Sequence, residues 1–315
     1  MTAVVRVGTC SWADKTLLDS GKFYPADVVK KPRERLAYYS SHFDLVEVDS
    51  SFYAIPAEEV TSGWVELTPG SFVFDVKAYG LFTGHGVGPR TLPADFRSAL
   101  PASAQAKRNI YMSDFGPDLL DEVYRRFENA LLPLDSAGKL GVVLFQFPPW
   151  FGPRHDNREV LRSLRARLPQ FEVAVEFRNG AWLGEGDRDY TLGLLRDHRL
   201  NYVSIDGPQG FPSSLPPLTE ATGRTAVVRF HGRNSETWMK KNITAAERFN
   251  YDYPQHELRE WLPRVRELAE KAEEVHLLMN NCHEDKAVNN ARQLAGMLAD
   301  LPAPDFSPPQ RRLTI

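Results

Sequence analysis

The chain has 315 residues, of which 42% are hydrophobic and 25% are charged, and its formal net charge is −3. This composition allows a large buried core and excludes a globally basic nucleic-acid-binding surface or an acidic tail. Two cysteines, Cys10 and Cys282, are too few for a disulfide scaffold or a cysteine-ligated zinc site. No apolar run reaches the length of a membrane span, and MTAVVRVGTC lacks a signal-peptide pattern, so we expect a cytoplasmic protein that contacts no membrane.

Short segments rich in Val, Phe and Leu alternate with helical patterns along the chain. The expected strands are VVRVGTC from Val4, DLVEVDS from Asp44, FVFDVKA from Phe72, GVVLFQF from Gly141, FEVAVEF from Phe171, NYVSID from Asn201, AVVRFHG from Ala226 and VHLLMNN from Val275. The expected helices span residues 32–43, 118–131, 157–168, 190–198, 257–274 and 287–298. Pro263 is expected to kink or split the fifth of these helices.

Eight alternating β and α units predict a single-domain (β/α)8 TIM barrel over residues 1–301, followed by a proline-rich tail over residues 302–315. The segment 207–224, rich in Pro and Gly, replaces a clear helix after the sixth strand. The alternative is a doubly wound open sheet, which usually carries a G-x-G-x-x-G turn after its first strand. Here that turn reads GTCSWADK, which favours the barrel.

Alternation of side chains predicts which residues line the inside of the barrel, because outward side chains contact the helices and are apolar. By this rule Val203 and Ile205 face outward. Polar residues of the opposite parity face inward: Arg6, Glu47, Asp49, Asp75, Lys77, Gln146, Glu176, Arg178, Ser204, Asp206, Arg229, His231 and Asn280. Burying charges is costly unless partners neutralise them. We interpret Arg6 and Asp75 as structural ion-pair members and the strand-end groups as a functional site at the C-terminal mouth.

These strand-end groups suit acid–base chemistry on an anionic, hydroxyl-rich substrate such as a sugar phosphate. The candidate catalytic residues are Glu47, Lys77, Glu176, Asp206 and His231. Glu176 or Glu47 would act as general acid or base, since neighbouring carboxyls can hold different protonation states. Lys77 and Arg229 would stabilise developing negative charge, and His231 would shuttle a proton. A plain network of salt bridges is the alternative interpretation of the same residues.

The expected partner is a small anionic or sugar-like ligand. Arginine forks match phosphate and carboxylate oxygens, and aromatic rings stack on sugars. The candidate substrate-binding residues are Trp12, Tyr53, Gln146, Arg178, Trp182, Arg229, Asn280 and Asn281. Five other histidines are interpreted as structural or surface residues: His42, His155, His198, His256 and His276.

Two further interpretations stay open. The cofactor is unknown, and a divalent metal is a less favoured alternative because no HExxH motif is present. Its candidate ligands are Glu47, His85, Glu176, Asp206, His231 and His283. A nucleic acid is an alternative partner, bound by basic residues expected around the mouth: Arg224, Arg233, Lys240, Lys241 and Arg248.

Several strand-end motifs carry a resemblance to one family. They are GTCSW, KFYP, VEVDSSFYAIP, FVFDVKA, LGVVLFQFPPWF, VEFRNGAW, VVRFHG and MNNCHEDKAVNNA. In this order they resemble the YecE-like proteins, the domain-of-unknown-function 72 family, over the chain to about Leu298. The resemblance implies a TIM barrel, a cytoplasmic location and no established reaction. The chain departs from the family pattern at Cys10 and Ser11 and at Thr83 to His85.

The leading hypothesis is therefore a hydrolase or lyase acting on a phosphorylated or polyhydroxylated substrate at the barrel mouth. The first alternative is a nucleic-acid-binding or phosphodiester-cleaving protein. It rests on the similarity of the family's barrel to the endonuclease-IV and xylose-isomerase type, which is an analogy of fold. The second alternative is a non-catalytic anion-binding module, which would bind a ligand without turning it over.

Overall fold

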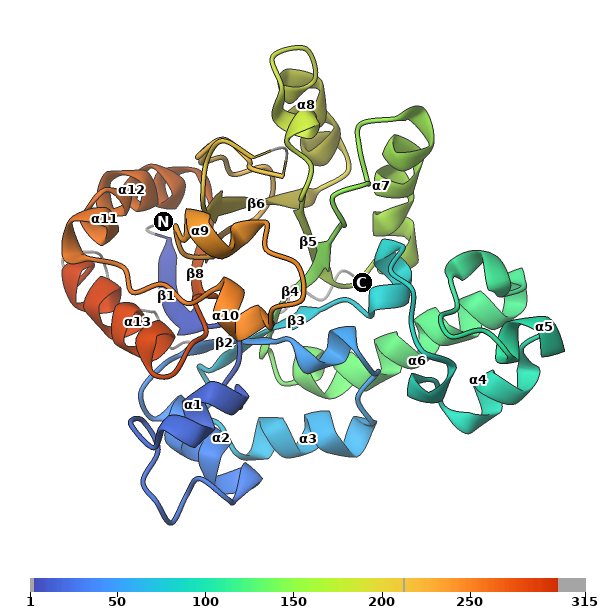
Figure 1. Cartoon of the computed structure of the whole chain (residues 1–315), viewed down its shortest axis with the longest axis horizontal. Coiled ribbons are helices and arrows are strands. Elements are labelled where there is room, and N and C mark those ends of the chain that lie inside the picture. Colours follow the sequence, from blue (N-terminus) through green and yellow to red (C-terminus); the bar gives the residue numbers. More distant parts are fainter. Residues whose placement is uncertain (1–2, 212, 300–315) are drawn as a thin grey trace, which may run out of the picture.

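Eight parallel strands form a closed barrel in the computed structural model, which describes residues 3–211 and 213–299. Each strand pairs with the next, and β8 pairs with β1 (Figure 1). The strands are β1 (Val4–Thr9), β2 (Leu45–Val48), β3 (Val73–Lys77), β4 (Leu140–Gln146), β5 (Glu172–Glu176), β6 (Leu200–Asp206), β7 (Thr225–Phe230) and β8 (Glu274–Met279). The expected (β/α)8 barrel is confirmed. The expected tail, residues 302–315, lies outside the described residues.

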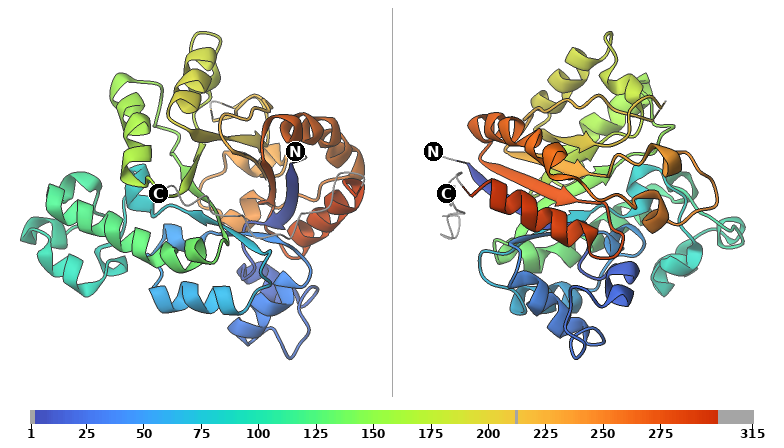
Figure 2. Two further views of the ribbon diagram at one scale, coloured as in Figure 1. Left: turned by 180° about the vertical axis from the view of Figure 1, so that it is seen from behind. Right: turned by 60° about the vertical axis from the view of Figure 1, so that its left-hand side comes forward.

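A helical layer surrounds the strands, and α13 packs along β1 and β8 (Figure 2). The main helices are α2 (Pro32–Ser40), α3 (Glu58–Glu66), α6 (Pro117–Ser136), α7 (His155–Arg167), α8 (Arg188–Asp197), α12 (Trp261–Lys271) and α13 (Lys286–Met297). Shorter helices are α1 (Lys15–Ser20), α4 (Ala94–Ala99), α5 (Ala102–Gln105), α9 (Ser235–Trp238), α10 (Ala245–Arg248) and α11 (Gln255–Arg259). As expected, β6 and β7 have no helix between them in the described residues.

Two features of the helical layer follow from local sequence. The sequence EEVTSGWVE of α3 was not predicted as a helix, because Gly63 and the β-branched residues lower its helix propensity. Tertiary packing against α6 stabilises it instead. The expected split at Pro263 is confirmed, since α11 ends at Arg259 and α12 begins at Trp261. Pro263 thus lies in the first turn of α12, where a missing N–H costs nothing.

The barrel interior has its own small apolar cluster, formed by Cys10, Leu45, Val73, Val142, Leu144, Ala174, Val203, Val227 and Leu278. This cluster confirms the expected inward parity on most strands. On β6 the prediction was wrong, because Val203 faces inward and pairs with the inward-facing Val227. Tyr202, Ser204 and Asp206 therefore face the helices. The sequence LNYVSID carries apolar residues at both parities, so alternation alone could not orient this strand.

An ionic network closes the N-terminal end of the barrel. His276 Nδ1 lies 3.0 Å from both carboxylate oxygens of Asp75, and its Nε2 lies 3.3 Å from Glu274 Oε2. Arg6 extends the network to Glu274 at 3.3 Å and to Asp44 at 3.5 Å. Arg6 and Asp75 thus make the structural ion pairs expected of them. These groups are paired with one another, which leaves the opposite end for the candidate site.

The opposite pole carries the loops that follow the strands, because all eight strands run in the same direction. Three long connections at this pole run from β3 to α6, from β6 to β7 and from β7 to α11. The β3–α6 connection includes α4 and α5, which form an outlying group at one side of the barrel (Figure 1). No helix within the described ranges is long and apolar enough to cross a lipid bilayer.

Candidate active site at the C-terminal mouth

Arg229 of β7 forms the floor of the mouth and joins acids from two other strands. Its Nη2 donates to Glu47 Oε1 of β2 at 2.7 Å, and its Nη1 donates to Glu176 Oε2 of β5. Nη1 also lies 3.2 Å from Gln146 Oε1 of β4. All three charged side chains are almost completely buried. The convergence expected from strand alternation is therefore present, and one guanidinium fork creates it.

A second set of groups surrounds Glu176. Arg178 Nε lies 2.5 Å from Glu176 Oε1, an ion-pair distance without hydrogen-bond alignment, and Arg178 Nη2 donates to Gln146 at 3.3 Å. His231 Nε2 lies 3.4 Å from the same Glu176 oxygen. The amide nitrogen of Asn280 lies 2.7 Å from His231 Nδ1. When Asn280 donates to Nδ1, the imidazole proton is on Nε2 and faces Glu176.

The two acids on Arg229 have opposite electrostatic environments. Burial raises the pKa of Glu47 above its ordinary value, although Arg229 and Lys77 partly offset this effect. Burial acts in the same direction on Glu176, but Arg178 and Arg229 outweigh it and hold the pKa of this carboxyl well below its usual range. Burial and the nearby Arg178 lower the pKa of His231 to about 3. At neutral pH Glu176 is thus ionised and His231 is neutral.

Two cations lie closest to solvent at this mouth. Lys77 Nζ, at the end of β3, donates to Asp49 at 2.8 Å and lies 4.6 Å from the centre of the Phe52 ring. The Lys77 and Arg178 side chains are 10% and 13% exposed. Tyr53, next to Phe52, is 61% exposed. A ligand entering the mouth would therefore meet these two cations before the buried acids.

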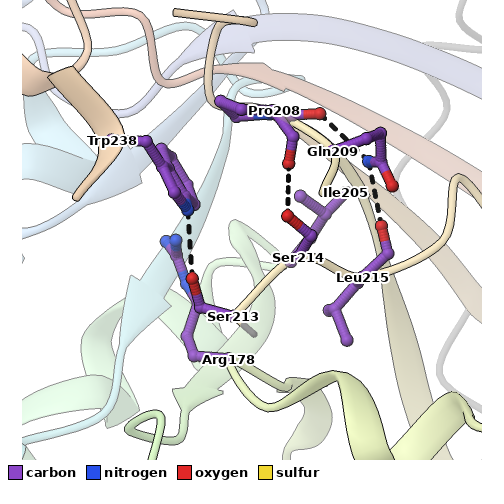
Figure 3. A pocket seen from close by; sticks show the side chains of 9 residues that line it. Arg178, Ile205, Pro208, Gln209, Ser213, Ser214, Leu215 and Trp238 are labelled. Atoms are coloured by element: carbon purple, nitrogen blue, oxygen red, sulfur yellow. Dashed lines mark hydrogen bonds between the residues drawn. The ribbon is translucent and has the colours of Figure 1, made fainter. Parts of the chain in front are cut away.

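A pocket with about 230 Å³ of empty space, part of it open to solvent, adjoins the ionic network and shares Arg178 with it (Figure 3). It is lined by Arg178, Ile205, Gly207, Pro208, Gln209, Ser213, Ser214, Leu215 and Trp238. The Trp238 indole N–H donates to Ser213 at 3.0 Å, and the Arg178 guanidinium lies 5.9 Å from the Trp238 ring. The β6–β7 and β7–α11 loops thus build one wall of the mouth.

Asp206 lies outside the barrel, which corrects its expected place among the acids of the mouth. It accepts hydrogen bonds from Arg233 at 2.8 Å, from the Tyr253 hydroxyl at 2.7 Å and from the Trp261 indole at 2.7 Å. The cause is the orientation of β6, which points Asp206 toward α12. Asp206 therefore fastens the segment after β7 to the outer face of the sheet.

Three expected binding residues, Trp12, Trp182 and Asn281, are instead packed against other parts of the protein. Trp182 is fully buried, stacks on Phe177 and donates to the carbonyl of Phe151 at 2.6 Å. Trp12 packs edge-on against Trp64 at 5.6 Å, outside the barrel.

Asn281 is buried as well, and it donates to the carbonyl of Tyr251 and to Asn290 Oδ1, both at 2.8 Å. Asn280, Tyr53, Gln146, Arg178 and Arg229 do lie at the mouth, whereas Trp12, Trp182 and Asn281 do not contact it.

One of the five basic residues proposed for nucleic-acid contact lies away from the mouth, and two others are bound to groups of the chain. Arg224 precedes β7, so it lies at the opposite pole, where it pairs with Glu273 at 2.8 Å. Arg233 is held by Asp206, and Arg248 donates to the carbonyls of Trp238 and Lys240. Within the described residues, no group of three or more His, Cys, Asp or Glu side chains is placed to hold a metal ion.

Two residues at the site were not predicted as part of it. Cys10 Sγ lies 3.5 Å from Glu47 Oε2 and 3.6 Å from Arg229 Nη2. Cys10 has the same strand parity as Arg6, and this alternation could have indicated that its side chain points into the barrel. His85 was considered only as a metal ligand, yet its ring lies 5.0 Å from that of Phe52. No local pattern indicates the fold of the loop that carries it.

The fold and this mouth define the chain as a TIM-barrel protein with a charged, largely buried site at the C-terminal ends of its strands. Residues 6–312 match the family described as "Protein of unknown function DUF72". The chain therefore belongs to this family, as the motifs indicated.

Relatives and solved structures agree with this assignment. The chain is 32% identical over 300 residues to the UPF0759 protein YunF of Bacillus subtilis, covering 94% of this chain and 95% of that protein. It is 28% identical over 173 residues to YecE of Escherichia coli K12, covering 54% and 52%. A DUF72 family protein of Enterococcus faecalis superposes with a TM-score of 0.76 at 26% identity, covering 98% and 100%. One of Thermotoga maritima gives 0.73 at 29% identity, covering 94% and 99%.

Proposed function

We propose that the protein is an enzyme of the hydrolase or lyase type, acting on a small phosphorylated or polyhydroxylated substrate at the barrel mouth. One observation carries the proposal: two carboxyls bound to the same guanidinium have pKa values shifted in opposite directions. Burial raises the pKa of Glu47, whereas Arg178 and Arg229 hold that of Glu176 low despite its burial. Carboxyls separated in this way can divide the roles of proton donor and permanent anion.

The site residues then take distinct roles. Glu47 exchanges a proton with the substrate, since a raised pKa brings a carboxyl closer to working pH. Glu176 stays ionised and holds Arg178 and Arg229 in position. Lys77 and Arg178 bind the anionic group of the substrate and stabilise negative charge that develops on it. Gln146, whose side-chain oxygen is occupied by the two arginines, presents its amide N–H groups to the same ligand.

Ligand binding tests the part of this proposal that assigns an anionic ligand to Lys77 and Arg178. Isothermal titration calorimetry with inorganic phosphate and a panel of sugar phosphates should show binding to the wild-type protein. Lys77→Met should weaken it about tenfold or more, because a charge-assisted hydrogen bond is worth about 1.5–3 kcal/mol. Lys15→Met removes an exposed lysine that is also paired with a single aspartate, and it should bind like the wild type. Equal affinity of Lys77→Met and wild type would contradict the assignment.

Turnover tests the part of the proposal that makes Glu47 the group that exchanges a proton with the substrate. The same panel is incubated with enzyme and followed by ³¹P and ¹H NMR, and Glu47→Gln should lower turnover by about 10²–10⁴-fold while keeping ligand affinity. Glu66→Gln, at an exposed surface carboxyl, is the matched control and should retain full turnover. Tight binding by the wild type without turnover over long incubation would contradict an enzyme and favour the anion-binding module.

A further inference from the structure

His85 lies at the rim of the mouth in a row of four aromatic side chains. Its ring is 5.0 Å from that of Phe52 and 5.7 Å from that of Trp150, and Phe52 lies 5.2 Å from Tyr53. The four rings come from the loops after β2, β3 and β4. Tyr53 and Trp150, at the two ends of the row, are 61% and 66% exposed. Such exposure contributes little to stability, and it leaves ring faces available to a ligand.

The hydrogen bonds of His85 define which of its nitrogens carries the proton. Thr83 Oγ1 donates its only proton to the carbonyl of Gly80 at 3.0 Å. The same oxygen lies 2.8 Å from His85 Nδ1, and the two contacts together favour the tautomer in which Nδ1 carries the proton and donates to Thr83. In this tautomer Nε2 has a free lone pair. In the described part of the chain, Nε2 has no hydrogen-bond partner.

The surroundings of His85 keep this ring neutral. Burial and the positive charge of Lys77 lower its pKa to about 4. The charge that acts on His85 is that of Lys77, at the end of β3, and Asp49, which is bound to Lys77 and follows β2, acts on the neighbouring Tyr53. Tyr53 is the nearby phenol, while Phe52 and Trp150 carry no titratable group. A neutral imidazole thus lies against the Phe52 ring, which Lys77, the cation that we assign to anion binding, also contacts.

We propose that His85 Nε2 is a proton-accepting group of the site, which removes a proton from a substrate hydroxyl or a water held beside the anion on Lys77. This inference rests on the function proposed above and supplies its missing partner: Glu47 donates a proton and His85 accepts one. In the step, the O–H bond breaks, an Nε2–H bond forms and the oxygen keeps the electron pair. Lys77 stabilises the resulting anion, and the proton leaves His85 for solvent. Thr83 is the positioning residue, because it fixes the tautomer.

The tautomer is tested by ¹⁵N NMR of histidine-labelled protein, with His85→Gln used to assign the signals. We expect the neutral Nδ1–H form at pH 7 and a midpoint of protonation near pH 4. Thr83→Val removes the acceptor and should give a mixture of tautomers, while Thr83→Ser keeps the hydroxyl and should restore the wild-type spectrum. An Nε2–H tautomer in the wild type, or a midpoint at or above 6.5, would overturn the inference.

Contact with the ligand is tested with inorganic phosphate, whose binding is measured separately by calorimetry. Phosphate should shift the Nε2 signal of His85 in the wild type but not in Lys77→Met. On any substrate found with the panel, His85→Gln should lower kcat about 10²-fold and remove the acidic limb of the pH profile. Phosphate binding without any change at His85, or full turnover by His85→Gln, would overturn this inference alone. Absence of phosphate binding would overturn the proposed function, and this inference with it.

Discussion

At the scale of single residues, the geometry of one guanidinium organises the site. Arg229 uses separate nitrogens for Glu47 and Glu176, which come from strands on different sides of the barrel. A lysine at this position would present a single point charge and could not bind two carboxylates in fixed directions. Burial makes this arrangement sensitive to truncation, because removal of one member leaves the other charges unpaired.

Arg229→Met is therefore expected to lower the free energy of unfolding by about 3–5 kcal/mol, the usual effect of breaking a buried ion pair. Urea denaturation followed by circular dichroism measures it. Arg196→Met, which breaks an exposed pair with Glu220, should cost no more than about 1 kcal/mol. A loss as small for Arg229→Met as for Arg196→Met would show that the buried network adds nothing to stability.

His276 gives the protein a pH-dependent stability. Burial alone lowers the pKa of this histidine, but Asp75 and Glu274 outweigh burial and raise it to about 9. Because the pKa in the folded state is raised above the unfolded value near 6.5, the stabilisation is complete below about pH 6.5 and is lost as the pH rises through about 9. At about 1.4 kcal/mol per pH unit, this corresponds to about 3 kcal/mol.

Urea denaturation at a series of pH values should show this decline between pH 6.5 and 9 in the wild type. His276→Gln should be less stable than the wild type at pH 6 and should lose the decline. His155→Gln, at a histidine that is 82% exposed, should keep it. A curve for His276→Gln parallel to that of the wild type would contradict the assignment to His276.

At the scale of elements, the orientation of β6 decides how the loop after β7 is held. Asp206 points outward and binds Arg233, Tyr253 and Trp261. These three partners flank the segment that contains α9 and α10, and α9 carries Trp238, which lines the pocket beside Arg178. The outer face of β6 therefore positions a wall of the mouth without contributing a group to it.

Asp206→Asn is expected to loosen this loop, because Arg233 loses the most buried of its three carboxylate partners, the others being Glu257 and Glu260. Amide hydrogen exchange in residues 232–253 should become about tenfold faster or more, equivalent to a loss of about 1–3 kcal/mol. Exchange in the strands should stay unchanged. Asp189→Asn, at an aspartate side chain that is 86% exposed, is the control. Unchanged exchange in residues 232–253 would show that the loop is held by other contacts.

At the scale of the whole molecule, closure of the barrel links the stability of every strand to that of its neighbours. The β1–β2 contact is short, with Gly8 opposite Leu45 and Thr9 opposite Val46. A Cβ at Gly8 would lie 2.0 Å from the carbonyl oxygen of Leu45, so only glycine allows this approach. The site depends on this closure, since Glu47 lies on β2 and Cys10 follows β1.

Gly8→Ala should therefore destabilise the entire barrel, by about 1–3 kcal/mol or more, because the collision involves backbone atoms that cannot move aside. Thermal unfolding followed by both circular dichroism and tryptophan fluorescence should shift to lower temperature together. Gly193→Ala, in α8 where a Cβ meets nothing within 4 Å, should leave stability equal or higher. Separate shifts of the two signals would contradict a shared loss of stability.

The sequence alone determined the barrel and the floor of its mouth. Eight apolar segments separated by helical patterns define the fold, and strict alternation in segments such as VEV and VAVEF points Glu47 and Glu176 inward. These features depend on neighbouring residues along the chain, so they can be inferred from it. The motifs at the strand ends indicated the family for the same reason.

The tertiary structure decided the remaining features. Both faces of β6 are apolar, so only its register with β7 shows that Asp206 points away from the mouth. Trp182 could have been a ligand contact until the stacking on Phe177 and the hydrogen bond to Phe151 showed it to be buried. The free nitrogen of His85 follows from a hydrogen bond to Thr83, whose geometry depends on how its loop folds. The first two depend on contacts between segments, and the third depends on the path of a loop, none of which a local pattern encodes.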